Sequence, residues 1–126
     1  MQQEEHNKAI VCGVLESIFN REDLSVFESH PGLGDLKKNS SVVRAAFPDL
    51  RFRIEQQVAE GDLVATHAWI SGTQTGSLFG LPPSGKHLEF QGVSVARVVN
   101  DQIVQYNSEV GWIGVLMQLG VLPLPR

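Results

Sequence analysis

The sequence is poor in cysteine, since Cys12 is the only one in 126 residues. A single cysteine excludes a disulfide within the chain and completes no zinc-binding set. The four histidines show neither HxxH nor HExxH spacing, so the residues predict no metal site. The first five residues are acidic and polar, unlike the basic start of a signal peptide. Together these features predict a cytoplasmic protein.

The chain also lacks a surplus of basic residues and a long apolar run. Ten Lys and Arg stand against fourteen Asp and Glu, which gives a formal net charge of −4. The longest basic run is Lys37-Lys38, too short to attract a phosphate backbone, so we expect no nucleic acid partner. Apolar stretches such as residues 111–117 are far shorter than the roughly 20 residues of a membrane-spanning helix. We therefore expect no membrane partner.

The composition is that of a folded chain. Hydrophobic residues make up 42% and charged residues 19%, a balance that buries a core rather than one that stays disordered. A length of 126 residues fits one domain, and the sequence shows no repeat, linker or low-complexity segment. We therefore expect a single domain over residues 1–126.

Apolar residues recur at helical spacing in the first 48 residues. The pattern predicts a helix over residues 4–20, a short second helix over 22–27, and a third over 35–47 that Pro48 ends. Pro31, Gly32 and Gly34 interrupt regular structure between the second and the third. The first part of the chain is therefore predicted to be helical.

From residue 50 the apolar period changes from 3.6 to 2, which is typical of strands. The alternation predicts strands over residues 50–59, 63–75, 86–99 and 102–109, hairpin turns at 60–62 and 100–101, a Gly- and Pro-rich loop at 76–85 and a closing helix over 111–119. Helices followed by a four-stranded antiparallel meander predict an α+β fold, with the helices on one face of the sheet.

Residues 80–87 read GLPPSGKH, which nearly matches the phosphate-binding motif GxxxxGK[ST]. His87 stands where a hydroxyl must bind magnesium, and Pro82 and Pro83 lack the N–H donors that a phosphate needs. A strand pattern also follows where the motif requires a helix. These departures favour a hairpin connection over a nucleotide site.

Strand alternation gathers polar side chains on one side of the last two strands. They are Glu89, Gln91 and Arg97 on the third strand, and Gln105, Asn107 and Glu109 on the fourth. Such a side is either a solvent-facing surface, which the residues slightly favour, or the wall of a polar pocket. Glu109 is the best carboxylate candidate, because burial next to Trp112 would raise its pKa toward the range of a general acid or base.

Two histidines have open roles. His30 lies in the Pro/Gly break, where its side chain either points into a cleft or caps a helix at the surface. His67 lies in mid-strand among apolar neighbours, where a hydrogen-bonded sheet histidine is the simpler interpretation.

Seven short motifs follow one another between residues 46 and 123. They are AFPDL at 46–50, EGD at 60–62, GTQTG at 72–76, GLPPSGK at 80–86, Arg97, IV at 103–104 and QLGVLP at 118–123. In this order they resemble the SnoaL-like polyketide cyclase family. The resemblance implies the cone-shaped fold of the nuclear transport factor two-like superfamily, in which a curved antiparallel sheet wraps around the N-terminal helices and encloses a cavity. It also implies that the polar strand sides line this cavity.

The resemblance further implies a function. Family cyclases close a ring in an aromatic polyketide by acid–base side chains, with neither metal nor cofactor, and commonly form homodimers or larger assemblies. We therefore expect cyclase, isomerase or lyase chemistry on a small hydrophobic or aromatic molecule, with Glu109 and His30 as catalytic residues. The expected substrate-binding residues are His67, Trp69, Gln91, Arg97, Asn107 and Trp112.

Departures from the family pattern leave other functions open. The last strand of family members usually carries a Trp, with a catalytic Asp four positions later, where this chain has Asn107 and Gly111. Gln74 stands where many members have His. The missing Asp favours a non-catalytic protein of the same fold that binds a small hydrophobic ligand. A third interpretation is a dimerising protein with a collapsed cavity.

Overall fold

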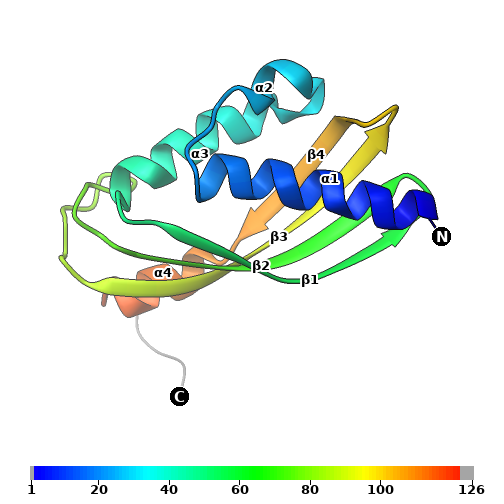
Figure 1. Cartoon of the computed structure of the whole chain (residues 1–126). Coiled ribbons are helices and arrows are strands. Elements are labelled where there is room, and N and C mark those ends of the chain that lie inside the picture. The colour runs from blue at the N-terminus through cyan, green and yellow to red at the C-terminus, as the bar shows by residue number, and fades with distance from the viewer. Residues whose placement is uncertain (1, 123–126) are drawn as a thin grey trace.

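The computed structural model describes residues 2–122; Met1 and residues 123–126, including Pro123 of the last motif, lie outside the described residues. Helices come first and strands second, as predicted (Figure 1). The elements are α1 (Gln2–Phe19), α2 (Val26–Ser29), the 3-10 helix η1 (Pro31–Leu33), α3 (Gly34–Ala46), β1 (Arg51–Glu60), β2 (Leu63–Thr73), β3 (His87–Val99), β4 (Gln102–Val110) and α4 (Trp112–Gln118). The α+β prediction is confirmed.

The second helix starts later than predicted. Glu22 has a φ of 52°, in the left-handed region that a continuing helix does not use. The Asp23 carboxylate accepts hydrogen bonds from the backbone N–H and the hydroxyl of Ser25, at 3.1 and 2.6 Å. This local turn competes with helix formation, so α2 begins only at Val26.

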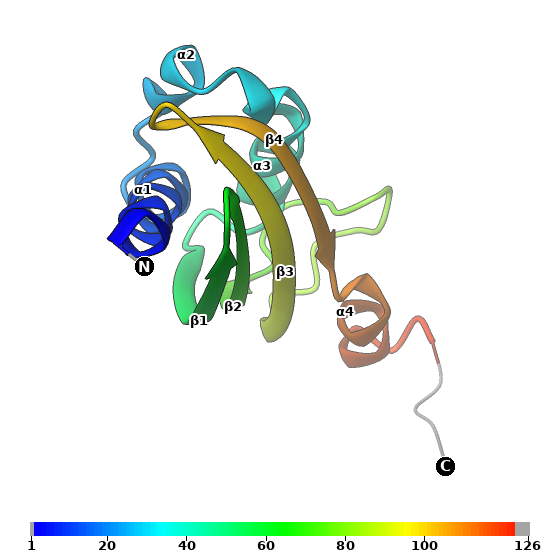
Figure 2. The same ribbon diagram turned by 90° about the vertical axis from the view of Figure 1, so that its right-hand side faces the viewer.

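The four strands form one antiparallel sheet in the order β1-β2-β3-β4. Figure 2 shows the sheet curving from β1 to β4 around the space that faces α1 and α3. A bulge between Ile54 and Gln56 adds one residue to β1. Because side chains alternate, this residue moves Gln57 to the inner face, where a straight alternation would not place it.

The core lies between the concave face of the sheet and the helices. One face of α1 is apolar at helical spacing and is buried against β1 and β2. On β2 and β3 the even-numbered positions are buried or half-buried, and most odd-numbered positions are exposed or half-buried. The buried inward set includes Val64, Ala68, Ile70, Leu88, Phe90, Ala96 and Val98. Packing against the helices therefore decides which side of each strand faces inward.

Candidate functional site

A cavity of about 320 Å³, here called the inner cavity, lies between α3 and the concave face of the sheet. Its apolar walls include Phe19, Leu36, Val43, Phe52, Ala68, Ile70, Phe90 and Val110. Polar groups come from Asn39, Ser40, Thr66, Ser94, Tyr106 and Ser108. Exposed or half-buried Val42, Phe79 and Trp112 also line it, from three separate parts of the chain. A cavity of this size and lining suits a small molecule that is mostly apolar.

Neutral polar side chains cross the concave face in a line that we call the polar row: Gln57, Thr66, Ser94, Tyr106 and Ser108. Gln57 Nε2 donates to Thr66 Oγ1 at 3.1 Å. Thr66 stands opposite Ser94 in the register of β2 and β3, and Ser94 stands opposite Ser108 on β4. The row offers hydrogen bonds without charge.

Tyr106 carries the phenol of this row, the group in it that loses a proton most easily, and this phenol stays protonated. Burial raises the pKa of its hydroxyl above the usual range, and a hydrogen bond with Ser94 offsets this only in part. A buried neutral phenol is a hydrogen-bond donor at all physiological pH values. Tyr106 is thus suited to hold a ligand oxygen.

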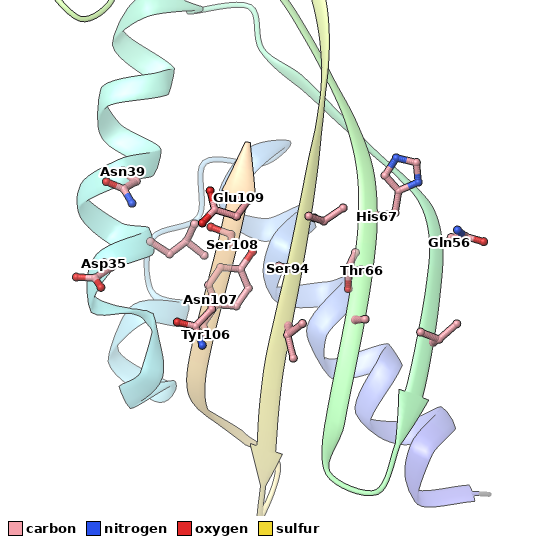
Figure 3. Close-up of a pocket in the computed structure, with 15 residues that line it drawn as sticks. Asp35, Asn39, Gln56, Thr66, His67, Ser94, Tyr106, Asn107, Ser108 and Glu109 are labelled. Carbon is pink, nitrogen blue, oxygen red and sulfur yellow. The ribbon is translucent and has the colours of Figure 1, made fainter. Parts of the chain in front are cut away.

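A second hollow of about 480 Å³, here called the outer hollow, runs across the outer face of the sheet and over the edge of β4 toward α3 (Figure 3). The outer face contributes Gln56, Val58, Ala65, His67, Val93, Val95, Asn107 and Glu109; α3 contributes Asp35, Leu36 and Asn39; and the polar row contributes Thr66, Ser94, Tyr106 and Ser108, which line both hollows. In Figure 3 Glu109 on β4 and Asn39 on α3 lie on opposite sides of the gap between these elements. The exposed Glu109 lines both hollows, and among the described residues it is the one carboxylate that lines the inner cavity.

The expectation that the polar strand sides line the enclosed cavity is wrong for most of these residues. His67 stands opposite Val93, Trp69 opposite Gln91, and both pairs face outward. The apolar side of each strand takes the concave face because it packs against the helices. On the outer face His67 Nε2 lies 2.6 Å from Gln91 Oε1.

The remaining predicted binding residues divide between the faces. Arg97 also lies on the outer face, where it donates to Asp62 Oδ1 at 2.7 Å. Asn107 and His67 line the outer hollow, and Trp112 lines the inner cavity. Of the six predicted binding residues, the structure therefore places only Trp112 at the inner cavity.

The structure does not bring His30 and Glu109 together. His30 Nδ1 accepts a hydrogen bond from the backbone N–H of Ile103 at 2.9 Å, near the start of β4. Glu109 lies six residues further along this strand, about 20 Å away at ~3.3 Å per residue. Partial burial lowers the pKa of His30, which agrees with a neutral ring that accepts at Nδ1. His30 thus fastens the segment before η1 to β4.

Gln74 is fully buried, although it does not line the inner cavity. Its Nε2 donates to the carbonyl oxygens of Gly76 and Pro82 at 3.1 and 3.2 Å, and its Oε1 accepts from Ser84 N–H at 3.2 Å. The Gln74 side chain thereby fixes the loop over residues 76–85. This role follows from burial, which residue type alone does not reveal.

The polar row was missed by sequence reasoning. Ser94 and Thr66 belong to strand sides that are otherwise apolar, such as the side with Phe90, Ala96 and Val98. A hydroxyl on the core side of a strand needs a partner or a ligand, and that signal is present in the sequence.

Across residues 2–122, no three His, Cys, Asp or Glu side chains lie close enough together to hold a metal ion. None of the described helices is both long enough and apolar enough to cross a membrane.

The model of the SnoaL-like polyketide cyclase family matches residues 9–119. The chain belongs to this family. Compared with curated protein sequences, it has no significant match.

Solved structures show the same fold. This SnoaL-like protein superposes on AclR, a proposed hydroxylase from Streptomyces galilaeus, with a TM-score of 0.86 and 24% identity over 98% of this chain and 86% of that one. A proposed SnoaL-like polyketide cyclase from Jannaschia sp. CCS1 gives a TM-score of 0.81 with 21% identity over 95% of each chain. IdmH, a proposed polyketide cyclase from Streptomyces antibioticus, gives 0.76 with 23% identity over 90% of this chain and 98% of that one.

Proposed function

We propose that this SnoaL-like protein acts on a polyketide-like aromatic molecule held in the inner cavity, by acid–base chemistry that uses no cofactor. One observation carries this proposal. The inner cavity has apolar walls, a neutral polar row across its sheet side, and Glu109 as the carboxylate among its described lining residues. Apolar walls hold rings, and hydroxyl groups select ligands with oxygen substituents.

The proposed reaction is an intramolecular aldol closure. The Glu109 carboxylate takes a proton from a carbon next to a carbonyl group, and the resulting enolate carbon attacks a second carbonyl carbon of the same molecule. A carbon–carbon bond forms, and the proton on Glu109 passes to the new alkoxide oxygen. Tyr106 and Ser94 donate hydrogen bonds to the oxygen that carries the developing charge.

The test compares two carboxylate variants on aromatic poly-ketone esters, with products separated by chromatography. Glu109→Gln is expected to lower kcat by about 100-fold or more, because general-base catalysis contributes that much. Glu89→Gln, an exposed carboxylate on the neighbouring strand, is the control and is expected to keep full activity. Full activity of Glu109→Gln would overturn the catalytic role, provided that its melting temperature matches the wild type.

A second function is favoured by Gly111, which stands where family members carry the catalytic Asp. On this alternative the inner cavity binds its ligand without turnover. Wild-type protein would then show ligand-induced thermal stabilisation and no product. Because AclR is described as a proposed hydroxylase, products are to be identified by mass, which separates ring closure from oxygen insertion.

We also propose a homodimer formed through the outer face. Exposed Val58, Val93 and Val95 adjoin half-buried Ala65 on three neighbouring strands. Charged Arg53, Glu55, Glu89 and Arg97 stand on the same sheet around this apolar centre. An apolar patch on an otherwise polar sheet suits an isologous contact with a second copy of the chain.

A further inference from the structure

Residues 78–81 form a two-residue hairpin within the loop after β2. Leu78 N–H donates to the Leu81 carbonyl at 3.0 Å, and Leu81 N–H donates back to Leu78 at 2.8 Å. The two central residues, Phe79 and Gly80, have φ angles of +49° and +81°. Two positive φ values in a two-residue hairpin are the mark of a type I′ turn.

Phenylalanine is a poor residue for the first central position of this turn. The position favours Asn, Asp or Gly, because a bulky side chain is strained at positive φ. The β3–β4 hairpin supplies a comparison within the same chain, since Asn100 and Asp101, at φ of 51° and 63°, use turn-forming residues. The turn over residues 78–81 is therefore less stable with Phe79 than it would be with Asn, Asp or Gly at this position.

Burial does not compensate for this strain. The Phe79 side chain is 62% exposed, whereas Leu78 beside it is 1% exposed and anchors the hairpin in the core. Strained residues that the fold does not need are concentrated at functional sites. The reason for a phenylalanine at this position therefore lies outside the packing of the core.

Phe79 lies at the inner cavity. It lines this cavity together with Val42 of α3 and Trp112 of α4. The Phe79 and Trp112 rings meet edge to face, with centroids 5.0 Å apart at 89°, and Trp112 lies 5.5 Å from Phe90 on the cavity wall. An aromatic line thus runs from an exposed ring to the interior.

The segment that carries Phe79 is firmly attached. The buried Gln74 side chain binds both ends of the loop, and Gly76 N–H donates to the Ala46 carbonyl at 3.2 Å. A Cβ on Gly76 would lie 2.1 Å from the Ala45 carbonyl oxygen, so the loop passes directly against the end of α3. The exposed ring is therefore held at a defined place beside the cavity.

We propose that Phe79 determines ligand specificity at the inner cavity, by packing with Trp112 on a flat, uncharged ring system that extends past Val42. This inference rests on one part of the proposed function, that a ligand occupies the inner cavity. It does not require that the ligand is turned over. An apolar and aromatic rim holds a multi-ring ligand and rejects a charged group at that end. A single-ring ligand would lie deeper and would not touch Phe79.

Phe79→Asn tests this inference, because Asn suits the turn and removes the ring. The probes are dihydroxyanthraquinone, which is neutral and has three rings, and hydroxyacetophenone, which has one. Their dissociation constants are measured by quenching of tryptophan fluorescence. Phe79→Asn is expected to bind the three-ring probe about 10-fold more weakly, as lost aromatic contacts predict, and to bind the one-ring probe unchanged. Its melting temperature reports relief of the strained turn against loss of the Phe79–Trp112 ring contact, and a single cooperative transition confirms that the variant is folded.

Ile113→Asn is the matched control, since Ile113 on α4 is exposed to a similar extent, 68% against 62% for Phe79, and does not line the inner cavity. It is expected to bind both probes like the wild type. Equal binding of the three-ring probe by wild type and Phe79→Asn overturns this inference alone. Failure of the wild type to bind either probe overturns the proposed function together with it.

Discussion

The two faces of one sheet carry different chemistry. The inner face is apolar apart from the polar row, whose hydroxyl groups face the inner cavity. The outer face holds most of the charged and amide side chains of the sheet, and several of them have polar partners: Arg97 donates to Asp62, and His67 Nε2 lies 2.6 Å from Gln91 Oε1. The hydroxyl groups of the polar row also have protein partners, as Thr66 has in Gln57, but a hydroxyl can both donate and accept, so these groups can still bond to a ligand in the inner cavity. The less polar face is therefore the better candidate for ligand recognition.

The largest expected effect on stability comes from shortening a buried side chain on the inner face. Ile103 on β4 is 0% exposed and packs in the core, so Ile103→Ala is expected to lower the free energy of unfolding by about 2–5 kcal/mol. The measurement is urea denaturation followed by circular dichroism.

Val95→Ala is the matched truncation on the outer face. Val95 is 45% exposed, so its loss is expected to change stability by about 0.5 kcal/mol or less in the monomer. Equal losses for the two variants would contradict the assignment of inner and outer faces.

A charge on the outer face tests the proposed homodimer. Val93→Glu is expected to convert a dimer into a folded monomer, because a carboxylate would be buried without a partner at an apolar contact. Sedimentation equilibrium measures the mass, and circular dichroism confirms the fold. Leu24→Glu, which changes an exposed residue that lies outside the sheet and does not line the outer hollow, is expected to leave the dimer intact. A wild-type protein that sediments as a monomer at high concentration would exclude the homodimer.

The smallest of the expected effects is the pH dependence that His30 gives to the free energy of unfolding. His30 has a pKa below its ordinary value of 6.5, because it is partly buried and accepts the Ile103 N–H as a neutral ring. A lowered folded-state pKa means that the stabilisation is complete above about pH 6.5 and is lost as pH falls through the folded value. Urea midpoints are expected to fall between about pH 7.5 and pH 5.

His30→Asn keeps an acceptor and removes the titration. Its urea midpoint is expected to depend less on pH than that of the wild type over this interval. The same slope in wild type and His30→Asn would show that His30 titrates alike in the folded and unfolded states.

Much of the fold could be predicted from periodicity and turn residues. The pattern of residues 50–59 predicted β1 to within one residue at either end, and Asn100-Asp101 predicted the last hairpin. The second helix was predicted less well, because the hydrogen bonds between Asp23 and Ser25 replace its first turn. Such competition between side chain and backbone is settled by local geometry that periodicity does not describe.

The candidate site was harder to predict than the fold. Alternation correctly grouped Gln91 with Arg97 and Asn107 with Glu109, and the residues slightly favoured a solvent-facing side, as the structure shows for most of them. The family resemblance had placed the polar residues of this side at the cavity, where the structure finds only Glu109 among them. His30 was expected near Glu109, and its place at the opposite end of β4 depends on how η1 packs against that strand.

The sequence by itself determined the order of helices and strands, the α+β class and membership of the SnoaL-like family, because periodicity and short motifs are local properties. Only the tertiary structure decided which strand side faces the cavity and that Phe79 stands beside it. Alternation divides a strand into two sides without saying which one the helices cover. That choice depends on contacts between residues far apart in the chain, such as those between α1 and β1.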